Sequence, residues 1–279
     1  MFENPKVSNM KAAFDVAKYD MVWVCDSNAR SDLNALENAV EIFENDSSVG
    51  VVHHLIWAVD ANTIGGAIET AFLNSTHARM YLAINSLKLD SCLTGKSNFY
   101  RISSLEKFGG IAAFGKYIAE DNMIGQKLWR DGLAHRMTYN LALTSVKGMS
   151  LSSYFKRRIR WVRVRVCTVP GAVLLEPFTE SVVVGVLTSL ALNSLYGVPK
   201  AQFLIWHFLL WFISDFMLFL RQRKQTEGGI PKLSMQLILS YFIRELSALP
   251  VWIIGISGNT ASWRDKLYKI NFDGSINAM

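Results

Sequence analysis

The chain has 279 residues, of which 51% are hydrophobic and only 19% are charged, and its formal net charge is +6. The charges are dense up to residue 165 and sparse from 166 to 257, which argues against a wholly soluble protein. We therefore expect one soluble domain followed by a membrane portion. The three cysteines are widely separated and form no CxxC or His–Cys metal pattern, which argues against a disulfide framework and favours the cytosol: Cys25, Cys92 and Cys167.

Short apolar runs alternate with helix-period segments through the first half of the chain. Strands are predicted over 19–26, 49–53 and 92–100, the first of them buried on both faces of a parallel sheet. Helices are predicted from a Ser31 cap through Phe43, over 64–82 and over 118–130. Strands that alternate with helices predict an α/β fold, which we assign to residues 1–149.

The region from 150 to 170 is predicted to be a basic amphipathic helix at the membrane interface. Six of the ten residues from 156 to 165 are Lys or Arg. One interpretation is a cytoplasmic basic flank that orients the first membrane segment. The other is a phosphate-binding surface, because guanidinium forks bind phosphate oxygens in pairs and Trp161 offers a flat face.

Residues 171–279 are predicted to form the transmembrane region, with three crossings over 181–195, 201–220 and 233–257. The second segment is the clearest candidate and contains a single internal acid, Asp215. The third carries Arg244-Glu245 in its middle, so it either pairs these charges inside the bundle or breaks into interfacial pieces. Three crossings would put the basic tail on the side opposite to the other basic segments, and the sequence alone does not resolve this conflict.

Carboxylates stand at two places where ligands bind in α/β proteins. Asp26 ends the first predicted strand and could hold a divalent cation, although an Asx turn is the simpler interpretation. Glu120 and Asp121 open a predicted helix, where they could cap it or where one could act as a general base. His77 has no metal-type spacing with the cysteines.

Taken in order, Asp26, Glu120-Asp121 and Arg157-x-x-Arg160-Trp161 resemble the signature of processive-type family 2 glycosyltransferases. The wider amino-acid sequence is similar to the ceramide glucosyltransferases over nearly the whole chain. The stretches that carry this similarity are 4–10, 17–20, 23–27, 111–121 and 262–264.

The resemblance implies a GT-A-like nucleotide-sugar fold and a reaction in which ceramide displaces UDP from UDP-glucose with inversion. Asp121 would be the catalytic base and Asp26 the ligand of a metal, Mg or Mn, on the diphosphate. Lys6, Arg157, Arg160 and Trp161 would bind the donor and its diphosphate, and Glu120, His77 and Cys92 would lie near the active site.

The partners that the resemblance implies are UDP-glucose, ceramide and the lipid bilayer, with no nucleic acid. The location would be the Golgi membrane, with the catalytic domain facing the cytosol.

The family has a membrane anchor and leading strands, with one further aspartate, before the stretch that resembles residues 4–10. We therefore expect the fold of these 279 residues to be a partial one, with an exposed sheet edge, and their binding of UDP-glucose to be weak or absent. Two alternatives remain at this point. One is another membrane family 2 glycosyltransferase with a different lipid or polysaccharide acceptor, and the other is a non-catalytic membrane protein that binds anionic lipid.

Overall fold

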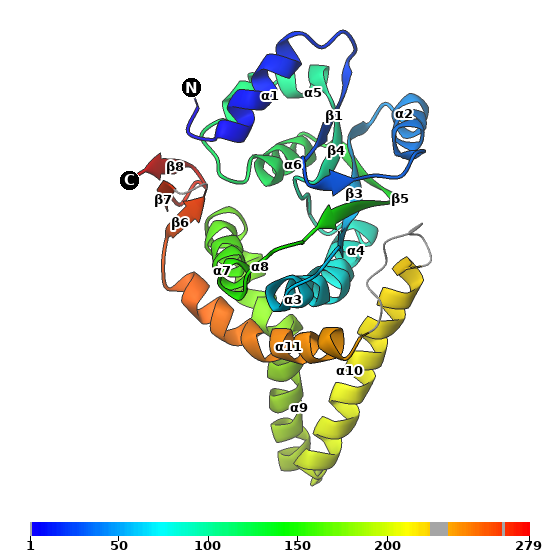
Figure 1. The fold of residues 1–279 in the computed structure, drawn as a ribbon, viewed down its shortest axis with the longest axis vertical. Coiled ribbons are helices and arrows are strands. Elements are labelled where there is room, and N and C mark those ends of the chain that lie inside the picture. Colours follow the sequence, from blue (N-terminus) through cyan, green and yellow to red (C-terminus); the bar gives the residue numbers. More distant parts are fainter. Residues whose placement is uncertain (1, 224–233, 264–265) are drawn as a thin grey trace.

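The computed structural model describes residues 2–223, 234–263 and 266–279 (Figure 1). The first half of the chain builds an α/β layer from these elements: α1 (Pro5–Asp15), β1 (Met21–Cys25), β2 (Ala29–Arg30), α2 (Ala35–Asn45), β3 (Val49–Val59), α3 (Ile64–Phe72), η1 (Leu73–His77), α4 (Ala78–Ser86), β4 (Ser97–Arg101), α5 (Ile102–Glu106), η2 (Ile111–Phe114), α6 (Glu120–Arg130) and β5 (Ala134–Ser145). The second half contains α7 (Leu151–Thr168), α8 (Pro170–Leu175), η3 (Glu176–Thr179), α9 (Ser181–Tyr196), α10 (Lys200–Arg223), α11 (Met235–Ile256), β6 (Thr260–Trp263), β7 (Lys266–Ile270) and β8 (Ile276–Ala278).

The five-stranded sheet is mixed, with the order β1-β4-β3-β5-β2. Only β3 and β5 pair in parallel, whereas β1–β4, β3–β4 and β2–β5 are antiparallel. The α/β class is confirmed, but the predicted parallel sheet is wrong. The strand before Asp26 is also less buried than expected, because β1 lies at the edge of this sheet and alternates between half-buried and exposed residues.

Helices cover both faces of the sheet at β3, which explains why all eleven residues of this strand are buried. Val51 packs with Ile124 and Leu128 of α6, while the next residue, Val52, packs with Ala39 and Phe43 of α2. Successive side chains of a strand point to opposite faces, so a strand covered on both sides reads as one continuous apolar run. The prediction over 49–53 found the start of β3 and missed the rest of it.

Other predicted elements occur with shifted bounds. The helix expected over 64–82 continues from α3 through a π-helical turn, η1, into α4. The helix expected after Ser31 begins at Ala35, and its N-cap Asn34 makes no side-chain capping bond. The basic helix over 150–166 is confirmed as α7, with Ser150 accepting a hydrogen bond from the Ser153 amide at 3.1 Å. The strand β5 was not predicted.

By length and composition, α10 and α11 could each cross a membrane, and the bent pair α8/η3 with α9 would be a third span if it counts as one. Figure 1 shows α9 and α10 side by side as a hairpin, with α11 lying across them beneath the sheet. In α11, Arg244 forms ion pairs with Glu245 and with Glu180, so the two charges expected within this segment pair inside the bundle. The start of the predicted third segment, Leu233, lies outside the described residues.

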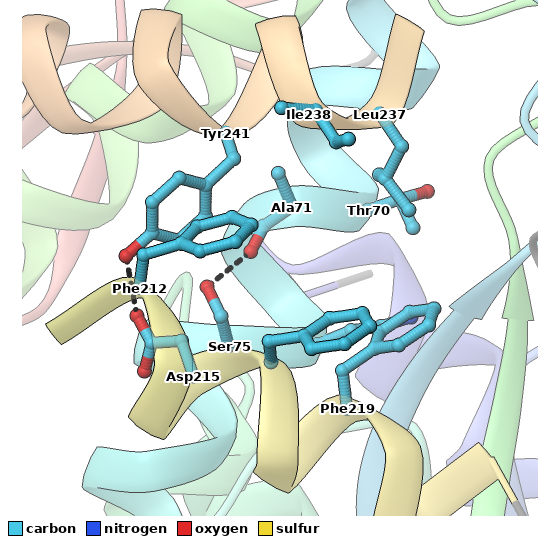
Figure 2. Close-up of a pocket in the computed structure, with 11 residues that line it drawn as sticks. Thr70, Ala71, Ser75, Phe212, Asp215, Phe219, Leu237, Ile238 and Tyr241 are labelled. Carbon is cyan, nitrogen blue, oxygen red and sulfur yellow. Dashed lines mark hydrogen bonds between the residues drawn. The ribbon is translucent and has the colours of Figure 1, made fainter. Parts of the chain in front are cut away.

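A polar anchor joins these apolar helices to the α/β layer (Figure 2). Asp215 of α10 is buried, pairs with Arg79 of α4, and accepts a hydrogen bond from the Tyr241 hydroxyl of α11 at 2.9 Å. Beside it, Phe212 and Phe219 line a small apolar pocket against α3. A buried carboxylate needs such partners, so Asp215 fastens both helices to the layer above.

The end of the chain differs from the predicted transmembrane region. The strands β6, β7 and β8 form a three-stranded antiparallel sheet, whose core includes Tyr268 and Ile270. This sheet packs against Val164 of α7, and Ser275 forms a bridge with Tyr117 ahead of α6. The small sheet is therefore attached to the α/β layer. Arg264 lies outside the described residues.

Candidate active site

The Asn-Pro-Lys stretch fastens α1 to the start of α6. Asn4 is buried and caps α1, because its side-chain oxygen accepts a hydrogen bond from the Lys6 amide at 2.8 Å. Its amide group donates to Glu120 Oε2 at 2.9 Å and to the Tyr117 carbonyl at 2.8 Å. Pro5 stands at the first helical position, where its missing N–H costs nothing. This local geometry places the Lys6 side chain next to α6.

Lys6 brings together three predicted carboxylates that are far apart in the sequence. Its ammonium nitrogen lies 3.0 Å from Asp26 Oδ1 and 2.8 Å from Glu120 Oε1. Asp121 borders the same point, because a Cβ placed on Gly95 would lie 2.9 Å from Lys6 Nζ and 3.0 Å from Asp121 Oδ2. The ends of β1, α1 and α6 therefore meet in one cluster of charges.

Lys96 is a second cation of this cluster that the sequence analysis missed. Its ammonium nitrogen lies 2.7 Å from Asp26 Oδ2 and 2.9 Å from Asn28 Oδ1. A single lysine just before β4 carries no motif, so only its pairing across the sheet with the end of β1 reveals it. A main-chain hydrogen bond joins the same two residues, since the Asp26 amide donates to the Lys96 carbonyl at 3.0 Å.

The two aspartates have opposite electrostatic environments. For Asp26, the charges of Lys6 and Lys96 outweigh the effect of burial and lower the pKa. For Asp121, burial and the neighbouring charge of Glu120 outweigh Lys6 and raise the pKa to about 6. Burial opposes the charge of Lys6, but the surrounding carboxylates, Glu120 first, raise its pKa above the ordinary value. Asp121 is therefore the acid of this cluster whose proton is exchanged nearest to neutral pH.

On α7, Arg157 and Trp161 belong to a second cluster, built around the buried Glu69 of α3. Arg157 Nε lies 3.3 Å and Arg158 Nη2 lies 3.2 Å from Glu69 Oε1. The Arg158 guanidinium lies 3.9 Å from the centre of the Trp161 ring, and Arg157 lies 5.2 Å from it. Neither Glu69 nor Arg158 was predicted, because a lone glutamate in an apolar helix shows no sign of the partner that it meets.

His77 is buried, and Cys92 is half-buried. His77 stacks on Tyr81 and contacts Trp161, and burial followed by the charge of Arg158 lowers its pKa to about 3. Burial raises the pKa of Cys92 to about 12. A neutral imidazole and a neutral thiol are suited to packing, and the prediction that both lie near the active site stays a prediction.

Arg160 donates to the Ser262 carbonyl of β6 at 3.2 Å. This contact brings the small sheet to the edge of the largest cavity, which has a volume of about 550 Å³. Lys6, Trp23 and Asp26 line the cavity on one side, and Trp263 of β6 lines it on another. Trp263, near the end of the chain, therefore lines the same cavity as the charge cluster formed near the start of the chain.

The described residues do not fit a divalent cation at Asp26 as the side chains stand. Oxygen ligands are available, but both carboxylate oxygens of Asp26 are paired with ammonium groups. Among the residues described, no three His, Cys, Asp or Glu side chains are arranged to hold a metal. Lys6 and Lys96 instead supply positive charge at this position.

An α/β layer with a charged cavity at the edge of its sheet, joined to apolar helices, defines a glycosyltransferase-like protein associated with a membrane. The sequence profile of glycosyl transferase family 21 matches residues 2–276, and the chain belongs to this family. This finding confirms the resemblance seen in the sequence.

Three relatives show the extent of the similarity. A ceramide glucosyltransferase from Komagataella phaffii is 30% identical over 97% of this chain and 68% of its own length. Ceramide glucosyltransferase 3 from Caenorhabditis elegans is 30% identical over 98% of this chain, and one from Gibberella zeae is 27% identical over the whole of it. The chain spans 59% and 71% of the lengths of these two relatives.

Among solved structures, a mannosyltransferase from Pyrobaculum calidifontis in complex with GDP-Man and Mn2+ aligns with 86% of this chain and 66% of its own. The TM-score is 0.40 and the identity is 16%. A likeness of this size supports no argument about ligands or metals.

Proposed function

We propose that the protein transfers glucose from UDP-glucose to the primary hydroxyl of ceramide, with inversion at the anomeric carbon. The observation that carries the proposal is the cluster of Lys6, Asp26, Glu120 and Asp121 beside a cavity of about 550 Å³, in a chain of family 21. A single displacement needs one base for the acceptor proton and positive charge for the leaving diphosphate, and both are present.

Asp121 is the proposed base, because its raised pKa lets it accept a proton from the acceptor hydroxyl near neutral pH. Lys6, Lys96, Arg157 and Arg160 are the proposed donors to the diphosphate, and Trp161 bounds the acceptor side. Asp26 orients the two lysines through its ion pairs. A two-chain lipid leaves the bilayer only at high cost, so a site next to α7 and the apolar helices suits it.

The test is an assay of membranes that contain the protein, supplied with a short-chain ceramide and with labelled UDP-glucose at high concentration, because weak donor binding is expected. We expect glucosylceramide with inverted anomeric configuration. Label that enters a polysaccharide or another lipid, with none in ceramide, would overturn the proposal. Chelation by EDTA tests the divalent cation that the resemblance implies, and a loss restored by Mg or Mn would support it.

We further propose that the protein resides in the Golgi membrane with the catalytic domain facing the cytosol. The basic α7 supports this orientation, because positive flanks remain on the cytosolic side. Protease added to sealed Golgi vesicles should then remove activity, and activity that survives until the vesicles are opened would contradict it.

The pH dependence of the reaction follows from Asp121. A base must be deprotonated to act, and its pKa is raised to about 6. Activity should therefore fall as the pH drops through about 6 and reach a plateau above it. The measurement is kcat/KM between pH 5 and pH 8, since kcat/KM reports the groups of the free enzyme, to which this pKa belongs. A flat profile through this range would contradict the assignment.

Lys6→Met should impair donor binding and shift this profile. Charged hydrogen bonds contribute about 1.5–3 kcal/mol, so kcat/KM for UDP-glucose should fall roughly tenfold to a hundredfold. Lys6 lowers the pKa of Asp121, so its removal should move the midpoint to higher pH. Lys11→Met is the matched control, because Lys11 lies in the same helix and pairs only with the exposed Asp15 in the described structure. Equal effects of the two substitutions would contradict the assignment.

A further inference from the structure

A narrow polar hollow lies between α7, η3 and α11, with Trp161 in its wall. Its walls include Phe72, Arg158, Trp161, Glu180, Ser247 and Ala248. The hollow has a volume of about 30 Å³, which leaves room for about two groups the size of a water molecule. The hollow is thus shaped for small polar groups and excludes a sugar ring.

Arg158 carries hydrogen-bond donors in this hollow that are not satisfied. Its exposed fraction is 4%, and Nη2 is paired with Glu69. Phe72 lies 4.1 Å and Trp161 3.9 Å from the guanidinium carbon, measured to the ring centres. Nε and Nη1 find no acceptor among the described residues. Leaving buried donors unpaired is costly, so a ligand that brings an acceptor oxygen would be stabilised here.

The charges of the hollow indicate a neutral ligand. Each guanidinium in its walls already has an acidic partner: Arg158 with Glu69, Arg165 with Glu176, and Arg244 with Glu180. Glu69 is shared with Arg157, and Arg244 also pairs with Glu245, so four guanidinium groups face four carboxylates and a phosphate group would meet no excess of positive charge. Carbonyl and hydroxyl groups fit better, because they can accept from Arg158 and donate to a glutamate.

The hollow adjoins the proposed donor side and also the apolar helices. Arg158 in its wall shares Glu69 with Arg157, a proposed ligand of the diphosphate, and Trp161 in its wall lies 5.2 Å from the Arg157 guanidinium. On the opposite side, Val251 and Ala248 of α11 complete the wall. Next to them on α11, Leu246 is 69% exposed and Leu249 36% exposed, on a helix apolar enough to span a membrane.

We propose that this hollow binds the amide carbonyl and hydroxyl groups of the neutral lipid acceptor, with its chains lying along α11. The inference rests on the proposed function and names the acceptor subsite within it. Arg158 would donate to the amide carbonyl, and Trp161 would separate the lipid head from the diphosphate side. The acceptor's primary hydroxyl would then point towards Asp121.

Filling the hollow should weaken acceptor binding without affecting the donor. Ala248→Val and Ala248→Leu should raise the KM for a short-chain ceramide in graded steps, because each added carbon takes space that the ligand would occupy. The increase should reach roughly tenfold for Leu, which corresponds to about 1.4 kcal/mol of binding free energy. The KM for UDP-glucose should stay unchanged. Leu210→Phe is the control, since it adds volume on the exposed face of α10, a different apolar helix that does not line the hollow.

The outcomes separate the two proposals. No glucosylceramide from the unsubstituted protein would overturn the proposed function itself. An active protein in which Ala248→Val leaves the ceramide KM unchanged, or raises both KM values equally, would overturn the subsite alone. Ala248→Val adds only two methyl groups, so it provides the measurement if Ala248→Leu does not fold.

Discussion

Asp121→Asn should lower kcat by about 10²–10⁴-fold, the usual contribution of a positioned general base. Asparagine has the same shape as aspartate but cannot accept the proton of the acceptor hydroxyl. The fold should tolerate the change, because burial and Glu120 already disfavour the charged form of Asp121. The KM for UDP-glucose should change little, since Lys6 and Lys96 keep their ion pairs with Asp26.

The measurement is kcat at saturating donor and acceptor, together with the unfolding temperature of the purified protein. Asp131→Asn serves as the control, because Asp131 caps the other end of α6 and pairs with the surface Lys107. If Asp121→Asn kept kcat within threefold of the original value while the chain remained folded, Asp121 would not be the base.

Glu69→Gln should produce the largest loss of stability. Glu69 is fully buried and forms ion pairs with both Arg157 and Arg158, of which Arg158 is itself 4% exposed. Removing one partner leaves buried positive charge uncompensated, which typically costs about 3–5 kcal/mol. The unfolding temperature should fall clearly. Activity should fall as well, because Arg157 and Trp161 would no longer be held in place.

A double substitution separates this electrostatic cost from general damage to α3. Arg158→Met combined with Glu69→Gln should recover part of the stability, because it removes one of the two stranded charges. Glu37→Gln, an exposed glutamate on α2, should change nothing. An unfolding temperature for Glu69→Gln equal to that of Glu37→Gln would show that the Glu69 pairs contribute no stability.

Elements with strong local signals were predictable from the sequence. The basic amphipathic pattern predicted α7, and the long apolar run predicted α10, because these signals depend on near neighbours. Strand pairing was not predictable in the same way. The run before Asp26 looks like a buried parallel strand, yet it pairs antiparallel with β4 at the edge of the sheet.

The sequence by itself determined the α/β class, the helices apolar enough to cross a membrane and the basic α7, and it singled out Asp26, Asp121 and Arg157 as candidate site residues. Only the tertiary structure decided that Lys6 and Lys96 pair with Asp26, that Glu69 holds α7, and that β6 brings Trp263 to the wall of the cavity. The physical reason is one of range. Periodicity and capping act over a few residues, whereas ion pairs and sheet pairing join residues that are distant in the chain, and their partners become known only when the chain is packed.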